Sequence, residues 1–229
     1  MSDSFDVDAV LLDLDGTLLD TVADLAAATN AMLVEGGRAP LDLETVAAYV
    51  GKGAAVLVHR ALGGGLDARV PADEFEPAMA AFMRHYEREN GLRAVPYDGA
   101  LEGLEAMRAK GLALACVTNK PQRFADALLE RCAMARYFRL VVGGDALERR
   151  KPDPLPMRHA AERLGVEPAR CLAIGDSVND ALAARAAGMP VLAVPYGYNE
   201  GRDVRELDVD GIVASLAEAA GRIRPRRPG

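Results

Sequence analysis

The sequence predicts an α/β protein: a doubly wound parallel sheet with a helical domain inserted into it. Residues 9–12 form a continuous apolar run, typical of a strand buried on both faces. From residue 95 onward, strand-like and helix-like segments alternate, as they do in parallel sheets. The segment between these regions is Ala-rich with few strand signals. We therefore predict a core domain of residues 1–20 and 91–229, interrupted by a helical domain of residues 21–90.

The inserted domain is predicted to consist of helices separated by glycine-rich turns. In the first helix, residues 21–34, apolar side chains recur near helical spacing, and Gly36-Gly37 ends it. Glycines also flank Lys52 and form the run 63–65, and both segments are expected to separate neighbouring helices. The further helices are predicted over residues 43–50, 54–62 and 73–89.

The second part of the core domain is predicted to alternate strands with helices. The strands are expected at residues 112–118, 140–142, 171–175 and 190–194. The helices are expected at residues 101–110, 123–132, 155–164 and 181–187. The basic, proline-containing tail, residues 222–229, is expected to be frayed.

Composition narrows the possible classes of function and location. The 229 residues carry a net charge of −7, which argues against nonspecific binding to nucleic acid or to an anionic membrane. No apolar run approaches the length of a membrane span, and the acidic residues 1–8 do not resemble a signal peptide. Cys116, Cys132 and Cys171 are odd in number and widely spaced, so we expect free thiols and a cytoplasmic protein.

Polar residues follow several of the predicted strands. Asp13 and Asp15 come directly after the first strand, and Thr118-Asn119 end another. Lys151 lies downstream of the strand at 140–142, and the segment 175–180 contains two further aspartates. Because parallel strands present their carboxyl ends at one edge of a sheet, these groups are predicted to meet there.

Their chemistry is complementary. Carboxylates held close together repel each other, and a divalent cation relieves the repulsion, so Asp13 and Asp15 indicate a magnesium site. A carboxylate can also attack a phosphoryl group, whose charge a metal and a lysine can neutralise. Asp176 and Asp180 can complete the metal site. Taken alone, Asp13 and Asp15 are equally compatible with a solvated acidic turn.

In this order, four motifs resemble those of the haloacid dehalogenase superfamily of phosphatases, and the resemblance covers nearly the whole chain. They are Asp13-Leu-Asp-Gly-Thr17, Thr118-Asn119, Lys151-Pro152 and Gly175-Asp-Ser-Val-Asn-Asp180. The inserted domain resembles the helical cap of that superfamily. Within it, the chain is most similar to bacterial phosphoglycolate phosphatases, through the stretches 49–53, 141–145 and 194–199.

The resemblance implies roles for the acidic residues. Asp13 would attack phosphorus and form an aspartyl-phosphate. Asp15 would protonate the leaving alcohol and then activate the hydrolytic water. Asp13, the main-chain carbonyl of Asp15, and Asp176 would hold Mg²⁺, the implied cofactor. Asp180 would act through water or through residues around the metal.

The resemblance and the loop pattern together suggest the groups that bind the substrate. Lys151 would neutralise charge between Asp13 and the phosphoryl group, while Thr118 and Asn119 would bind phosphate oxygens. Lys52 lies on a glycine-flanked loop that a closed cap would present to the substrate, where it could bind a leaving-group carboxylate. Arg60 is a weaker candidate for that role. A solvated lysine is the alternative interpretation of Lys52.

The sequence is therefore interpreted as that of a magnesium-dependent phosphatase acting on a small phosphorylated metabolite, with 2-phosphoglycolate as first choice. A phosphatase for another small ester and a phosphosugar mutase are alternatives that share this core. A phosphorylation-dependent binding module of the receiver type is a different class. The length of the chain, the acid/base Asp15 and the inserted domain all speak against it. Either a monomer or a homodimer is compatible with the sequence.

Overall fold

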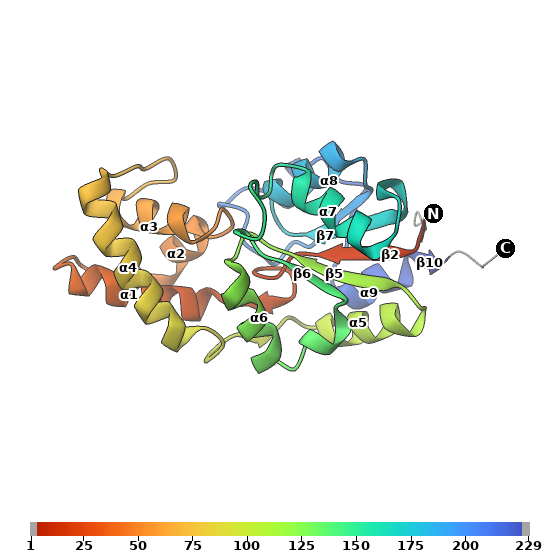
Figure 1. Ribbon diagram of the computed structural model, residues 1–229, viewed down its shortest axis with the longest axis horizontal. Helices are drawn as coiled ribbons and strands as arrows, with labels where there is room; N and C mark the ends of the chain where they lie inside the picture. Colours follow the sequence, from red (N-terminus) through yellow and green to blue (C-terminus); the bar gives the residue numbers. More distant parts are fainter. Residues whose placement is uncertain (1–3, 226–229) are drawn as a thin grey trace.

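A computed structural model of the chain describes residues 4–225. Its centre is a six-stranded parallel sheet with the order β6-β5-β2-β7-β8-β9 (Figure 1). The strands are β6 Leu140–Val142, β5 Ala113–Val117, β2 Ala9–Leu12, β7 Cys171–Gly175, β8 Val191–Ala193 and β9 Gly211–Ile212. The predicted α/β class with a parallel sheet is confirmed.

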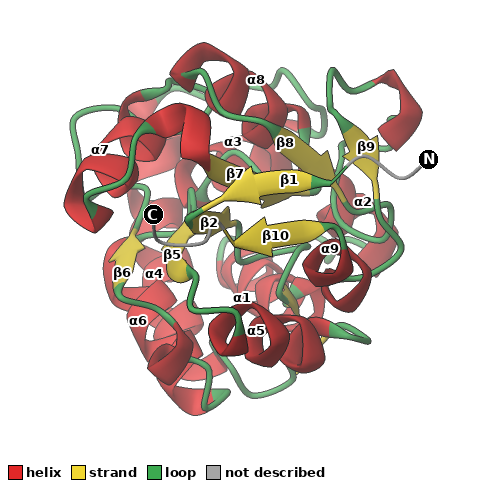
Figure 2. Ribbon diagram, turned by 90° about the vertical axis from the view of Figure 1, so that its right-hand side faces the viewer, coloured by secondary structure: helices red, strands yellow, loops and turns green. Residues whose placement is uncertain are grey.

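Helices cover both faces of this sheet. Helices α7 (Leu155–Leu164) and α8 (Val178–Ala187) lie on one face (Figures 1 and 2). Helices α5 (Ala100–Ala109), α6 (Gln122–Arg131) and α9 (Leu216–Gly221) lie on the other. Alternate residues of β2 therefore enter different apolar clusters: Val10 and Leu12 pack on the α5 side, Ala9 and Leu11 on the α7 side. Burial on both faces explains why the strand is continuously apolar.

The inserted segment forms a helical block beside the sheet (Figure 1). Its helices are α1 Val22–Glu35, α2 Leu43–Tyr49, α3 Ala54–Gly63 and α4 Ala72–Glu89. These helices supply most of a second apolar cluster, in which Phe82 is fully buried and to which Phe124 and Tyr198 of the sheet domain also contribute. A separate hydrophobic core supports the proposed division into a core domain and a domain of residues 21–90.

The two connections between the sheet and the helical block run side by side. Strand β3 (Leu19–Asp20) pairs antiparallel with β4 (Val95–Pro96). The buried carboxylate of Asp24, in the first turn of α1, accepts hydrogen bonds from the backbone N–H of Gly91 at 2.7 Å and of Arg93 at 2.8 Å. The chain is therefore tied together at the place where it leaves and re-enters the sheet domain.

Some elements differ from the prediction. Strand β1 (Phe5–Val7) pairs in parallel with β10 (Ile223–Pro225), so a frayed tail is wrong for residues 223–225, while 226–229 lie outside the described residues. The pairing holds because Ile223 is buried and Lys110 Nζ donates to its carbonyl oxygen at 2.8 Å. Short 3-10 helices occur at Ala135–Tyr137, Pro168–Arg170 and Val204–Glu206.

Two further expectations concern thiols and membranes. The three cysteines are free, as predicted, with Cys116 and Cys171 buried. Among residues 4–225, no helix combines the length and the apolar character that a membrane crossing requires.

Candidate active site

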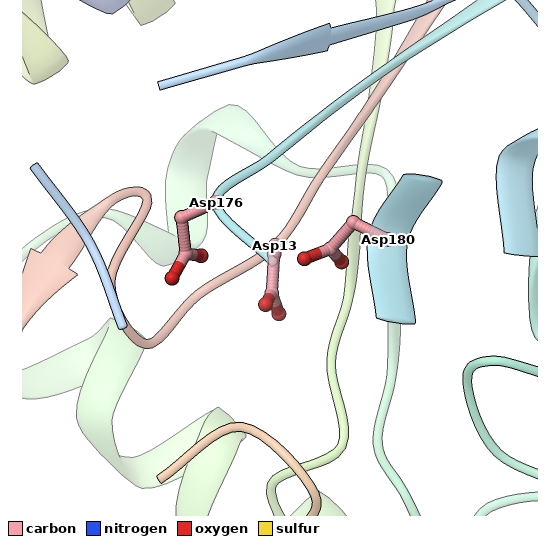
Figure 3. Close-up of side chains that lie close together, drawn as sticks. All are labelled: Asp13, Asp176 and Asp180. Atoms are coloured by element: carbon pink, nitrogen blue, oxygen red, sulfur yellow. The ribbon is translucent and has the colours of Figure 1, made fainter. Parts of the chain in front are cut away.

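Three carboxylates converge at the carboxyl edge of the sheet. Asp13 directly follows β2, Asp176 directly follows β7, and Asp180 lies in the first turn of α8. One oxygen of each lies within 4.8 Å of the others, and the side chains face a common centre (Figure 3). The backbone N–H of Asp13 donates to the carbonyl of Ile174 at 3.0 Å, which fixes the two neighbouring strand ends together.

Burial makes this cluster electrostatically unfavourable on its own. Burial raises the pKa of Asp13 to about 7, with Asp180 adding to the shift and Lys151 opposing it. Burial and repulsion from Asp180 and Asp13 raise the pKa of Asp176 well above its usual range. A divalent cation would relieve this repulsion, and the all-oxygen donor set suits a hard cation such as Mg²⁺. The residues present therefore fit a metal site.

Hydrogen bonds distinguish Asp180 from Asp13. Asp180 uses both of its oxygens within the protein: Oδ1 accepts from Lys151 Nζ at 2.6 Å, and Oδ2 accepts from the Ser177 N–H at 3.1 Å and hydroxyl at 2.7 Å. Asp13 contacts Lys151 through Oδ1 at 2.9 Å, whereas its Oδ2 accepts no hydrogen bond from residues 4–225. This pattern leaves Asp13 with an available oxygen and makes Asp180 a residue that orients Lys151 and the start of α8.

Lys151 lies beyond β6, and its ammonium group is buried among the carboxylates. Besides Asp13 and Asp180, its Nζ donates to the carbonyl of Val117 at 2.6 Å. Burial alone would lower the pKa of Lys151, but the two carboxylates outweigh it and raise the pKa. Lys151 therefore stays charged beside Asp13.

Thr118 and Asn119 follow β5 at the same edge. Asn119 Nδ2 donates to the carbonyls of Gly51 and Lys151, both at 3.0 Å, so it joins the loop before α3 to the sheet domain. Its buried Oδ1 has no hydrogen-bond partner in the described part of the chain. Thr118 is buried, and its hydroxyl accepts from the Lys120 N–H at 3.2 Å.

Asp15 is held by residues that the sequence analysis did not select. Its Oδ1 accepts from the Thr21 hydroxyl at 2.8 Å and from Lys120 Nζ at 2.9 Å. Lys120 Nζ also donates to the hydroxyl of Tyr86, on α4 of the helical block. The position of Lys120 directly after Asn119 was a usable signal. Tyr86 had none, because an aromatic residue on an amphipathic helix normally indicates core packing.

The predicted Lys52 lies apart from this group. Its Nζ pairs with Glu200 Oε1 at 2.6 Å, and Arg60 pairs with the same oxygen at 2.5 Å. Glu200 lies in the loop after β8, so these contacts join the helical block to the sheet domain. Lys52 and Arg60 do not line the cavity beside Asp13.

That cavity lies between the sheet edge and the helical block, with a free volume of about 40 Å³. The sheet domain contributes its polar lining and the helical block most of its apolar lining. The lining residues are Asp13, Asp15, Thr118, Asn119, Lys120 and Pro121 from the sheet domain, and Leu25, Val50, Gly51, Gly53, Ala54, Leu57, Phe82 and Tyr86 from the helical block.

Comparison with known proteins places this geometry in a family. Residues 7–188 match the haloacid dehalogenase-like hydrolases. The chain belongs to the haloacid dehalogenase-like hydrolase family. It is 51% identical over 214 residues to the phosphoglycolate phosphatase of Thiobacillus denitrificans, covering 93% of this chain and 94% of that protein. It is 53% identical over 213 residues to the phosphoglycolate phosphatase of Nitrosospira multiformis, with the same coverage of both.

Solved structures agree with the assignment. The crystal structure of a predicted phosphoglycolate phosphatase from Haemophilus somnus superposes with a TM-score of 0.88 at 31% identity, covering 94% of this chain and 97% of that one. Every carboxylate of the cluster, together with Lys151, lies inside the range matched to the haloacid dehalogenase-like hydrolases. The likeness therefore includes the sheet edge that carries the candidate site.

Proposed function

We propose that this hydrolase is a magnesium-dependent phosphatase whose substrate is 2-phosphoglycolate. The observation that carries the proposal is the available Oδ2 of Asp13, beside a buried Lys151 and within a carboxylate cluster suited to a metal. Relatives that share about half of their residues with this chain carry the name phosphoglycolate phosphatase. The geometry around Asp13 and the names of these relatives support the same reaction.

In the proposed reaction, Asp13 Oδ2 attacks phosphorus while the bond to the leaving oxygen breaks. Asp15 gives a proton to that oxygen, releasing glycolate and leaving an aspartyl-phosphate. Asp15 then takes a proton from water, which attacks the same phosphorus and restores Asp13. Asp13, Asp176 and the Asp15 carbonyl would hold Mg²⁺, which would neutralise charge on the phosphoryl group.

The other polar groups share the stabilisation of the phosphoryl oxygens. We assign this role to Lys151, which contacts Asp13 Oδ1 at 2.9 Å, and to the Thr118 hydroxyl and the Asn119 N–H, whose residues line the cavity beside Asp13. Phosphomonoester hydrolysis needs acceleration of up to roughly 10²¹-fold. Acid–base catalysis by a residue such as Asp15 supplies about 10²–10⁴ of it. The remainder requires the covalent step and the electrostatic groups acting together.

The apolar part of the cavity lining favours a phosphatase over a phosphosugar mutase. Leu25, Leu57 and Phe82 offer no hydrogen-bond partner to sugar hydroxyls. The three free thiols support the proposed cytoplasmic location.

A substrate panel tests the proposal. Phosphate release is measured from 2-phosphoglycolate, glucose 6-phosphate and p-nitrophenyl phosphate, with Mg²⁺ and with excess chelator. We expect the highest kcat/KM for 2-phosphoglycolate, by at least tenfold, and no turnover in chelator. Isomerisation of a sugar phosphate would indicate a mutase. A stable phosphoprotein without turnover would indicate a receiver-type module.

A further inference from the structure

We propose that Lys120, together with the hydroxyl of Tyr86, binds the carboxylate of the substrate's leaving group and thereby sets specificity. This proposal rests on the proposed phosphoglycolate phosphatase activity. Lys120 follows Asn119 at the edge of the sheet, and Tyr86 lies on α4 of the helical block. Both line the cavity beside Asp13, so a substrate would touch the two domains at once.

The ammonium group of Lys120 has a donor to spare. Lys120 is only 4% exposed, and its Nζ donates to Asp15 Oδ1 at 2.9 Å and to the Tyr86 hydroxyl. A lysine carries three N–H donors, and the third finds no acceptor among residues 4–225. A buried donor that faces a cavity is stabilised by an anionic ligand that accepts from it.

The Tyr86 hydroxyl offers a second donor at the same place. Its oxygen accepts from Lys120, and its own hydrogen has no acceptor in the part of the chain that the structure describes. Burial raises the pKa of Tyr86, so the hydroxyl keeps its hydrogen. A carboxylate has two oxygens and can accept from the Lys120 ammonium and the Tyr86 hydroxyl together.

The spacing of groups in the substrate favours this position. In phosphoglycolate, one CH₂ group separates the leaving oxygen from the carboxylate carbon. The cation that binds the carboxylate must therefore lie beside the acid that protonates the leaving oxygen. Lys120 Nζ lies 2.9 Å from the carboxylate of Asp15, the proposed acid.

The other lysines lack this combination of position and spare donor. Lys151 lies outside the lining of this cavity, where Asp13, Asp180 and the Val117 carbonyl hold its ammonium group. Lys52 is paired with Glu200 outside the cavity lining. Lys110 donates to carbonyls near the end of the chain.

The test compares 2-phosphoglycolate with 2-hydroxyethyl phosphate, an ester of similar size that has a neutral hydroxymethyl group in place of the carboxylate. The measured quantity is the ratio of their kcat/KM values, which does not depend on the fraction of folded protein. Lys120→Met is expected to lower this ratio about 30-fold, which is ~2 kcal/mol at 1.4 kcal/mol per factor of ten. Tyr86→Phe is expected to lower it about fivefold, while the remote control Lys110→Met leaves it within twofold.

Other outcomes overturn the assignment. Equal losses on both esters in Lys120→Met would mean that Lys120 only positions Asp15. A fall of the ratio in Lys52→Met but not in Lys120→Met would assign the carboxylate to Lys52. A wild-type protein with no preference for 2-phosphoglycolate would overturn the proposed function itself. Results from the variants alone would not overturn that function.

A binding measurement covers the case in which Lys120→Met has no measurable turnover. In the Asp13→Asn background, the affinities for 2-phosphoglycolate and for inorganic phosphate are compared with and without Lys120→Met. We expect Lys120→Met to weaken binding of 2-phosphoglycolate about 30-fold more than binding of phosphate. Equal weakening of both ligands would overturn the proposal.

Discussion

Replacing Glu200 with Gln tests whether one buried carboxylate fastens the helical block to the sheet domain. Glu200 lies in the loop after β8, and its side chain is 6% exposed. Its Oε1 pairs with Arg60 at 2.5 Å and with Lys52 at 2.6 Å. Because the Arg60 side chain is only 1% exposed, the substitution leaves a buried cation without its anion.

The expected loss of stability follows from the burial of the Glu200–Arg60 ion pair. Removing one partner of a buried ion pair costs about 3–5 kcal/mol. Gln keeps one acceptor oxygen, and Arg60 still donates to the carbonyls of Tyr49 and Leu66, so we expect a loss of ~2 kcal/mol. For a chain of this length, 1 kcal/mol changes Tm by about 2–4 °C. The predicted decrease in Tm is therefore roughly 4–8 °C.

The assay is calorimetric unfolding at pH 7, with Glu87→Gln as the matched control. Glu87 also joins the helical block to the sheet domain, through Arg123 at 3.3 Å, but their side chains are 61% and 59% exposed. Exposed pairs contribute about 0–1 kcal/mol, so this control is expected to change Tm by less than about 4 °C. A Glu200→Gln shift no larger than that of the control would mean that this carboxylate does not fasten the two parts of the molecule.

The Glu200 contribution also has a predicted pH dependence. Burial alone would raise the pKa of Glu200, but hydrogen bonds from Lys52 and Arg60 outweigh it and lower the pKa. The stabilisation is therefore fully present above the pKa of an unfolded Glu and is lost as the pH falls through the lower folded value. The difference in Tm between wild type and Glu200→Gln should shrink in acid.

Three further predictions concern the carboxylate cluster. Asp13→Asn is expected to reduce phosphate release by more than about 10³-fold with no loss of Tm, because the amide is a poor nucleophile but nearly isosteric. Activity within tenfold of wild type would contradict the assignment of Asp13 as the nucleophile. Mg²⁺ affinity, measured calorimetrically, is expected to rise between pH 6 and pH 8. Burial raises the pKa of Asp13 to about 7, and the metal binds the ionised form. A Kd independent of pH would argue against Asp13 as a ligand. Gly16→Ala is expected to weaken Mg²⁺ binding at least tenfold, because its Cβ would lie 2.4 Å from Asp176 Oδ2. Gly37→Ala, also at positive φ but with open space around it, is the control that should leave Mg²⁺ binding unchanged.

Residues that end parallel strands could be placed from the sequence. Asp13, Thr118 and Asp176 each follow an apolar run, and the sheet brings those strand ends together whatever the details of packing. The helices of the inserted block were also predictable, because helical periodicity and glycine stops are local signals.

Contacts between distant segments could not be predicted in this way. The pairing of Lys120 with Tyr86, and of Glu200 with Arg60, depends on how the helical block sits against the sheet domain, which no local pattern encodes. Strand β10 was not predicted for a similar reason. Arg224 and Pro225 were interpreted as part of a frayed tail, because their pairing with the distant strand β1 is not visible in the local sequence.

Phosphoryl transfer is proposed to pass through Asp13, and the stereochemistry at phosphorus distinguishes this route from direct attack by water. A phosphorothioate analogue of 2-phosphoglycolate, made chiral with oxygen isotopes, is hydrolysed in isotopically labelled water with Mg²⁺ present. Each in-line displacement inverts the configuration at phosphorus, so attack by Asp13 followed by attack of water gives overall retention. We expect retention. Inversion would mean that water attacks the substrate directly, and would contradict the covalent role of Asp13.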